Sequence, residues 1–380
     1  MYYGYSGGGL LFTLFFADGF VLPDMSAAVI VCLQLLVPLT IAALSVWDGV
    51  IGAEQRIALH SYASKAGTEH KCFSRPLAQN SGGNNIIERT LDAILTEIES
   101  NSNIHEKHQQ YVEYWTRQEW RHIEAHADVD ENLAKLHDLN PSLVSDELES
   151  KFSSTYSSTY GFRFPTNGHV LYIQVGTEVM GPTCVFPGRS SGGDLLQSVE
   201  TNQQEEKSCT TDDHQRGEGV KLITVPAVSG RLLRFDGRDL HAVPRPHDLW
   251  LLPFVQGAEY EPEEVWGRSV ILFNVWPGSE DPPLNVALDT SEGKEDTRDT
   301  ELCNTFSEWH EVDVVRSTRT KLPDTQDPNQ SVKVKVWLLG NERRRGYLMR
   351  TVNLLSPEHG GHERLRKALS AKSQVTELFI

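Results

Sequence analysis

His126 and Asp128 are the residues whose types and spacing most clearly suggest metal chemistry. They stand two positions apart in a segment that is expected to be a strand. On a strand, positions i and i+2 point to the same face, so a ring nitrogen and a carboxylate can meet at one point. Two histidines and one carboxylate on one face of an octahedron bind iron in non-haem Fe(II) oxygenases, and the opposite face stays open for chemistry. Because such a pair is also common by chance, the remaining ligands have to be located elsewhere.

A second histidine and an arginine extend the pattern. His241 follows a turn, a strand and a glycine turn, and Val243 and a proline come soon after it. Arg268 opens a hydrophobic strand, and a fixed guanidinium can bind a carboxylate through two parallel hydrogen bonds. Arg245 competes with Arg268, but it lies in a Pro-rich turn that is poorly placed to face inward. Two histidines, one aspartate and one inward arginine in this order are more specific than any one of them.

A zinc hydrolase is a second interpretation of the same segment, with His122, Glu124 and His126 as its residues. Hydrolytic sites of the HExxH type need helical i,i+4 spacing, whereas this segment is expected to be a strand. The iron site is therefore favoured over the zinc site.

Helices come first in the chain, and many short strands follow. Residues 52–66 carry apolar residues such as Ile57 at helical spacing and end at Gly67, while residues 84–99 form the clearest helix, with Asn85 as its cap. This order predicts an α+β fold with a sheet sandwich or barrel at its centre. Strands are expected at 45–51, 111–115, 169–175, 183–188, 221–226, 231–235, 268–276 and 333–337, and a last helix from Glu363 to Phe379.

From about Trp47 to Trp276, the chain resembles the 2-oxoglutarate/Fe(II) oxygenase superfamily, and within it the prolyl 4-hydroxylase-like branch. The matching pieces are the HxD of His126 and Asp128, the strand Leu171-Tyr172-Ile173-Gln174 with the following Gly181-Pro182-Thr183-Cys184-Val185-Phe186-Pro187, the distal His241, and the Arg268 strand.

The resemblance implies a double-stranded β-helix (jelly-roll) core with supporting N-terminal helices. It implies Fe(II) held by His126, Asp128 and His241, and 2-oxoglutarate as the cosubstrate. Arg268 would pair with the far carboxylate of 2-oxoglutarate, and Tyr172 would donate a hydrogen bond to the same group. Ascorbate would keep the iron ferrous.

Three departures from the family pattern bear on these roles. Gly181-Pro182 stands where the family usually has Gly-Gly, and the stretches from Asp128 to His241 and from His241 to Arg268 are long. An acidic insertion at 189–219 explains part of the length of the first stretch, and an excursion at 246–267 lies in the second. Outside the resemblance, Tyr172 could be an ordinary core aromatic and Arg268 a surface residue at a strand start.

The expected activity is a dioxygenase that hydroxylates a prolyl residue of a protein or a small molecule and releases succinate and CO2. Because Asp128 fills the third protein position on the metal, halogenation is disfavoured. Two alternatives stay open. One is a non-catalytic jelly-roll metal-binding module, and the other is a membrane-anchored structural protein.

The bulk composition excludes some other classes. The 380 residues carry a net charge of −17, which repels phosphate backbones and makes nucleic acid an unsuitable generic partner. The five cysteines are scattered and form no CxxC, so a disulfide framework or a structural zinc site is not expected. The oligomeric state is not indicated.

The N-terminal segment allows a membrane association. Residues 26–47 are uncharged and long enough to span a bilayer, but no Lys or Arg precedes Arg56. A signal anchor and a buried or removed extension therefore both remain open, and so does a cytoplasmic or a membrane-anchored location in the secretory pathway. The expected divisions are an extension at 1–46, an oxygenase domain at 47–278 with the 189–219 insertion, and a loop-rich extension at 279–380.

Overall fold

The structure, a computed structural model, describes residues 44–75, 85–101, 109–118, 123–134, 156–157, 162–179, 181–190, 221–243, 267–283, 286, 309–316, 336–338, 350–352 and 361–379. The chain divides into two compact units, 1–41 and 42–380, and all described residues belong to the second. The apolar segment up to residue 43, the insertion from residue 191, His122 and Arg245 lie outside the described residues. The interpretations that concern them stay predictions.

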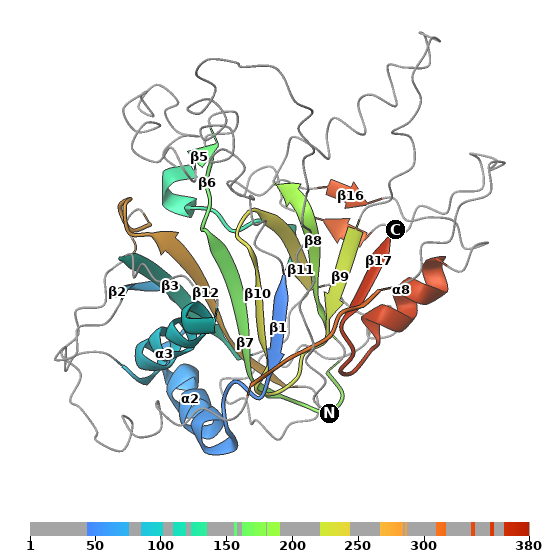
Figure 1. The fold of residues 1–380 in the computed structure, drawn as a ribbon, viewed down its shortest axis with the longest axis horizontal. Helices are drawn as coiled ribbons and strands as arrows, with labels where there is room; N and C mark the ends of the chain where they lie inside the picture. The colour runs from blue at the N-terminus through green and yellow to red at the C-terminus, as the bar shows by residue number, and fades with distance from the viewer. Residues whose placement is uncertain are drawn as a thin grey trace, which may run out of the picture. The chain divides into compact units, whose positions relative to one another are not determined.

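Two mostly antiparallel sheets form the body of the second unit (Figure 1). The first sheet has the order β13-β1-β10-β7-β12-β3-β2 and the second has the order β14-β17-β9-β8-β11-β4, with only β14 and β17 parallel among the described pairs. One apolar cluster joins Tyr172 and Leu233 of the first sheet to Val185 and Ile223 of the second. The two sheets therefore face each other, as the predicted sandwich requires.

The strands of the first sheet are β1 (Ser45–Asp48), β2 (Lys71–Arg75), β3 (Gln110–Arg117), β7 (Asn167–Val175), β10 (Leu232–Asp236), β12 (Arg268–Pro277) and β13 (His310–Glu311). Those of the second are β4 (Ile123–His126), β8 (Thr183–Ser190), β9 (Lys221–Val225), β11 (Asp239–Val243), β14 (Val315–Arg316) and β17 (Thr376–Phe379). Two small sheets pair β5 (Tyr156–Ser157) with β6 (Phe162–Arg163) and β15 (Val336–Leu338) with β16 (Arg350–Val352).

Eight of these strands pair in a nested order. β8 pairs with β9, β7 with β10, β4 with β11, and β3 with β12, all antiparallel. Along the chain, β3, β4, β7 and β8 therefore pair in reverse order with β12, β11, β10 and β9, as the two arms of one long antiparallel hairpin. This order places β4 beside β11 although they are far apart in sequence.

Helices α2 (Ala53–Ala66) and α3 (Ile86–Asn101) cover the outer face of the first sheet (Figure 1). The α3 stripe is fully buried at Ile87, Leu91 and Ile94, and the Glu88 amide donates to Asn85 Oδ1 at 3.1 Å. Both predicted helices and the predicted cap are confirmed. Ile57 of α2, in contrast, faces solvent.

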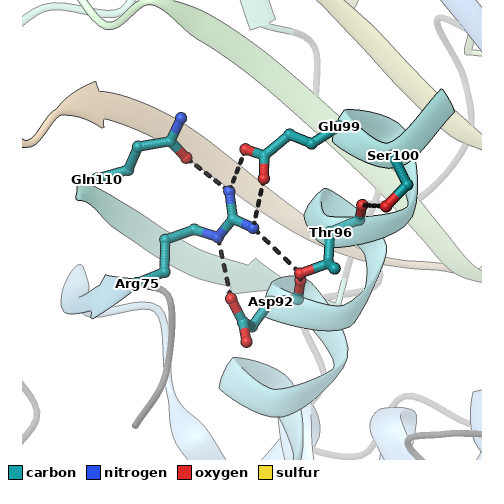
Figure 2. A network of polar contacts seen from close by, with 6 residues as sticks. All are labelled: Arg75, Asp92, Thr96, Glu99, Ser100 and Gln110. Atoms are coloured by element: carbon teal, nitrogen blue, oxygen red, sulfur yellow. Dashed lines mark hydrogen bonds and ion pairs between the residues drawn. The ribbon is translucent and has the colours of Figure 1, made fainter. Parts of the chain in front are cut away.

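Arg75, the last residue of β2, ties α3 to the sheet (Figure 2). Its Nε donates to Asp92 at 3.0 Å, and its Nη atoms reach Glu99, Thr96 and Gln110. Figure 2 shows that the two carboxylates come from the helix and the amide from the neighbouring strand. One guanidinium therefore fixes the distance between α3 and the edge of the first sheet.

The C-terminal helix is shorter than predicted. Helix α8 (Gly361–Leu369) ends well before Phe379, and β17 pairs with β9, with Leu378 opposite Leu222. The prediction of helix through Phe379 is wrong because Val375 and Leu378 are buried against the second sheet, and a ladder partner far away in sequence decides their conformation.

The other strand predictions are confirmed with shifted ends, as β1, β3, β7, β8, β9, β10 and β12, while β15 only overlaps the predicted strand at 333–337. Within the described ranges, no helix combines the length and the apolar composition needed to cross a membrane.

Candidate metal centre

His126, Asp128 and His241 come together in the second sheet. One possible ligand atom from each lies within 4.8 Å of the other two. His126 Nε2 is 3.6 Å from Asp128 Oδ1, and His241 Nε2 is 3.8 Å from Asp128 Oδ2. Both imidazoles therefore present Nε2 to the same carboxylate.

The β4–β11 ladder brings the two histidines together. His126 and His241 are directly opposite partners, and their ring centroids are 4.3 Å apart. Opposite residues of an antiparallel pair have Cβ atoms about 5 Å apart, which is a suitable span for two imidazoles that share a ligand.

Asp128 lies beyond the end of β4, so the prediction of a strand through both His126 and Asp128 is wrong in its last two positions. The alternation of a strand continues nevertheless, since Ala127 and Val129 are buried in the cluster with α8. With these two side chains turned to one side, the carboxylate of Asp128 turns to the other, toward the imidazoles.

The second nitrogen of His241 is held by the backbone. Its Nδ1 lies 3.3 Å from the Asp239 carbonyl oxygen, which can only accept a hydrogen bond. Nδ1 therefore carries the proton, and Nε2 presents a lone pair toward Asp128, the arrangement seen for metal-binding histidines. The Asp239 carboxyl accepts from the Gly188 amide at 2.8 Å, and burial raises its pKa to about 7.

The electrostatics of the cluster favour an ionised Asp128. Burial alone would raise the pKa of this carboxyl, but attraction to His241 and His126 when these imidazoles are protonated, and a hydrogen bond from Asn274, lower it below its ordinary value. Asn274 is buried on β12, opposite Glu113 of β3. It therefore orients the carboxylate from the facing sheet.

The donor set fits a first-row transition metal such as Fe(II). Two imidazole nitrogens and one carboxylate oxygen form the facial ligand set of non-haem iron proteins. Ligands at roughly 2.1 Å on adjacent octahedral positions lie about 3 Å apart. The separations of 3.6 and 3.8 Å are close to this, so small side-chain rotations suffice.

A cavity of about 80 Å³ opens beside the cluster, and Arg268 lines it together with His126, Asp128 and His241. Arg268 is 4% exposed, its Nη1 donates to the Gly181 carbonyl at 3.1 Å, and its guanidinium lies 5.1 Å from the centre of the Tyr172 ring. The structure thus brings a buried guanidinium to the same cavity as the three ligand candidates.

Tyr172 is not among the residues that line the cavity, but it contacts one that is. Its hydroxyl and the Thr183 hydroxyl are 2.7 Å apart, and Thr183 lines the cavity. In the sequence, Thr183 belongs to a segment that matches the family, but no role is predicted for it. Its position after Gly181-Pro182, beside Tyr172, was the available signal.

Sequence reasoning also missed His70 and Trp115, which line the cavity from the end of the first sheet. Their rings stack at 4.4 Å and are nearly parallel, with 5° between the planes. No local motif marks either residue, because the β2–β3 pairing alone brings them to the cavity.

No protein-family model and no curated protein matches the chain. Among solved structures, the chain is similar to HygX from Streptomyces hygroscopicus with iron bound, at 16% identity over 62% of this chain and 82% of that one, with a TM-score of 0.32. It is similar to the same protein with nickel and 2-oxoglutarate bound, at 15% identity over 62% and 83% of the two chains, with a TM-score of 0.31. A Pseudomonas putida prolyl-4-hydroxylase is similar at 11% identity over 63% and 87%, with a TM-score of 0.31.

HygX is thus a protein with bound iron, or with bound nickel and 2-oxoglutarate, and the third structure is a prolyl-4-hydroxylase. At such identities and TM-scores, the likeness by itself assigns neither a fold nor a function to this chain.

Proposed function

We propose that the chain is an Fe(II)- and 2-oxoglutarate-dependent dioxygenase whose iron ligands are His126, Asp128 and His241. One observation carries the proposal: three suitable ligand atoms within 4.8 Å of one another line the same cavity as the buried Arg268. A solvated pair of charged residues would not need a guanidinium buried beside it.

We further propose that the eight nested strands form a jelly-roll. The pairing of β3 with β12, β4 with β11, β7 with β10 and β8 with β9 supports this, because a jelly-roll is a long antiparallel ribbon folded over on itself. In this fold the β4–β11 pair presents its histidines to the interior between the sheets.

Three protein ligands leave three positions on an octahedral ion. When bound, iron with 2-oxoglutarate and dioxygen supplies the oxidation, releasing succinate and CO2. The protein orients the reactants, and the apolar cavity walls at Val170, Val270 and Leu272 exclude water. Asn274 donates a hydrogen bond to the Asp128 carboxylate and so favours its ionised, ligating form, in addition to the attraction of His241 and His126 when they are protonated.

In this proposal, Arg268 binds the far carboxylate of 2-oxoglutarate through two parallel hydrogen bonds. Tyr172 contributes to the same group through its hydroxyl pair with Thr183. Where Tyr172 donates to Thr183, the Thr183 hydroxyl has its own proton to donate into the cavity. The two hydroxyls then act as one donor.

For the substrate, we propose a prolyl residue of a protein or a small molecule, with ascorbate as the reductant that keeps the iron ferrous. Both proposals come from the family that the motifs resemble.

An anaerobic spectrum tests the metal and cosubstrate assignment. Full-length protein with Fe(II) and 2-oxoglutarate should show a visible metal-to-ligand charge-transfer band, and exposure to oxygen should release succinate. His126→Ala should lose both the band and the succinate, because only two ligands remain. His310→Ala, a change at an exposed histidine of β13, should retain both.

Two outcomes would contradict the proposal. Absence of the band in the wild-type protein would exclude chelation of 2-oxoglutarate by a bound iron. A band without any succinate release, even with added substrates, would instead favour the non-catalytic metal-binding module.

A further inference from the structure

His70 lines the cavity, and contacts with neighbouring side chains hold its ring in one orientation, unlike the ring of an ordinary surface histidine. It directly precedes β2 and lines the same cavity as the three ligand candidates, and its side chain is 40% exposed. One face of its ring stacks on Trp115 at 4.4 Å. The ring plane is therefore fixed, while part of the ring stays accessible to a molecule in the cavity.

A buried carboxylate fixes the remaining rotation of the ring. His70 Nδ1 lies 2.7 Å from Glu113 Oε1, and the Trp276 Nε1–H donates to Glu113 Oε2 at 3.1 Å. Glu113 is only 6% exposed, and both of its oxygens are engaged by ring nitrogens. Burying a carboxylate is costly, and a histidine that served only as a solvated surface group would not need one.

This geometry determines which edge of the ring is presented. Because Nδ1 is turned toward Glu113, Nε2 lies on the edge that turns away from the buried carboxylate. Burial would lower the pKa of His70, but the hydrogen bond and charge of Glu113 outweigh it and raise the pKa, and the charges of Glu131 and Asp128 act in the same direction. Burial also raises the pKa of Glu113.

Because the pKa of each partner is raised, the pair can share one proton across the Nδ1–Oε1 contact. With the proton on His70, the ring has N–H groups on both edges. With the proton on Glu113, Nδ1 accepts the hydrogen bond and Nε2 keeps its own proton. In both of these states Nε2 is a donor, so the cavity wall offers a hydrogen bond to an oxygen acceptor as long as the pair keeps the shared proton. Once that proton is lost, Nδ1–H donates to the Glu113 carboxylate and Nε2 presents a lone pair instead.

The charged groups on the cavity wall indicate which kind of acceptor His70 would bind. Arg117, Arg268, Asp128 and Glu131 also line the cavity. An anionic oxygen gains more from a charge-assisted N–H than a neutral carbonyl does. Near the carboxylates of Asp128 and Glu131, an incoming anion also needs such a donor to offset their repulsion.

We propose that His70 is a substrate-binding residue that donates a hydrogen bond from Nε2–H to a carboxylate on the substrate, with Glu113 as its positioning residue. The proposal rests on the proposed function, since it takes the cavity beside the metal ligands to be the substrate pocket. It adds a substrate class: a molecule or peptide segment that carries a carboxylate close to the reacting carbon.

The first test measures the positioning by Glu113. NMR of the full chain with isotope-labelled histidine, assigned through His70→Gln, follows the His70 ring through a pH titration. In the wild-type protein, Nε2 should carry a proton to a higher pH than in Glu113→Gln, where the ring should titrate like an isolated imidazole. An identical titration in the two proteins would overturn the positioning role.

The second test measures recognition of a carboxylate, with benzoate and its neutral analogue benzamide as probes. In the metal-free full chain, benzoate should shift the His70 ring resonances and should bind at least 10-fold more tightly than benzamide. His70→Gln should weaken benzoate binding about 10-fold. His310→Gln, the same change at an exposed histidine, should leave it unchanged.

Three results would overturn the proposal: no shift of the His70 resonances by benzoate, equal binding of benzoate and benzamide, or unchanged benzoate affinity in His70→Gln, which would place the anion on Arg268 alone. Because these titrations need no iron, they can succeed while the charge-transfer band is absent, and the reverse. Should Glu113→Gln fail to fold, benzoate binding to His70→Gln still tests the proposal. The replacement is compatible with folding because the His70 side chain is partly exposed on the cavity wall.

Discussion

Single side chains at the candidate site are fixed by contacts from both sheets. His241 is oriented by the Asp239 carbonyl, Asp128 by Asn274, and Arg268 by the Gly181 carbonyl and the Tyr172 ring. Each group thus reaches the cavity in a defined orientation before any ligand binds. Such preorganisation is what a metal and cosubstrate site needs, because a bidentate carboxylate contact is lost after a small displacement.

The role of Arg268 predicts a selective loss of 2-oxoglutarate affinity. Arg268→Lys keeps the charge but loses the planar fork, so the dissociation constant should rise roughly 10- to 100-fold, as expected for lost hydrogen bonds to a charged group. Titration of the charge-transfer band with 2-oxoglutarate measures this directly. Arg316→Lys, at an exposed arginine of β14, serves as the control. An unchanged dissociation constant in Arg268→Lys would remove the arginine from the cosubstrate site.

Among the elements, α3 and β11 differ in how far the sequence specifies them. The apolar stripe of α3, its Asn85 cap and its 3.6-residue period are local, so the helix could be predicted. β11 could not, because Asp239–Val243 is buried at every position and becomes a strand through pairing with β4 and β8. The iron-ligand candidate His241 lies on the element whose conformation depends on distant partners.

The Arg75 network predicts that α3 docking depends on one guanidinium. Arg75→Met should lower the free energy of unfolding by about 2–3 kcal/mol, less than for a fully buried ion pair because Asp92 and Glu99 are partly exposed. Urea unfolding measures the change. The same replacement at Arg316, which is exposed, should change stability by less than about 0.5 kcal/mol. Equal effects at the two positions would show that the network in Figure 2 contributes no stability.

For the molecule as a whole, His169 links stability to pH. It is fully enclosed in the first sheet and stacks on Phe273 at 4.3 Å. Burial, together with the charges of Arg234 and Arg75, lowers its pKa well below 6.5. The folded protein therefore keeps this imidazole neutral at a pH where the unfolded chain already binds a proton.

The free energy of unfolding depends on pH because the folded and unfolded states differ in whether they bind a proton at His169. Below about pH 6.5 the unfolded state takes up a proton that the folded state refuses, so the free energy of unfolding should fall as pH decreases, by up to about 1.4 kcal/mol per pH unit from this residue. Above that pH the imidazole is neutral in both states, so His169 adds nothing to the pH dependence of the free energy of unfolding. In His169→Phe, which keeps a planar ring beside Phe273, this component of the slope should disappear. Chemical unfolding between pH 5 and 8, values chosen to span roughly the pKa of free histidine, compares the two proteins, and parallel curves would contradict the assignment.

The sequence alone determined the features that depend on residue type and local period. It predicted α2, α3, most strands of the two sheets, and a set of candidate residues at His126, Asp128, His241 and Arg268 that the structure brings to one cavity. Side-chain chemistry and short spacings carry this information, and they do not depend on the rest of the fold.

Only the tertiary structure decided which distant residues meet. The opposite positions of His126 and His241, the strand in place of a helix at β17, and the contact of the cavity-lining His70 with the buried Glu113 all depend on the register of ladders between remote strands. A strand has no local signal for its partner, since pairing is set by the combined burial of many side chains. The residues of the proposed carboxylate site are therefore visible only after the sheets have formed.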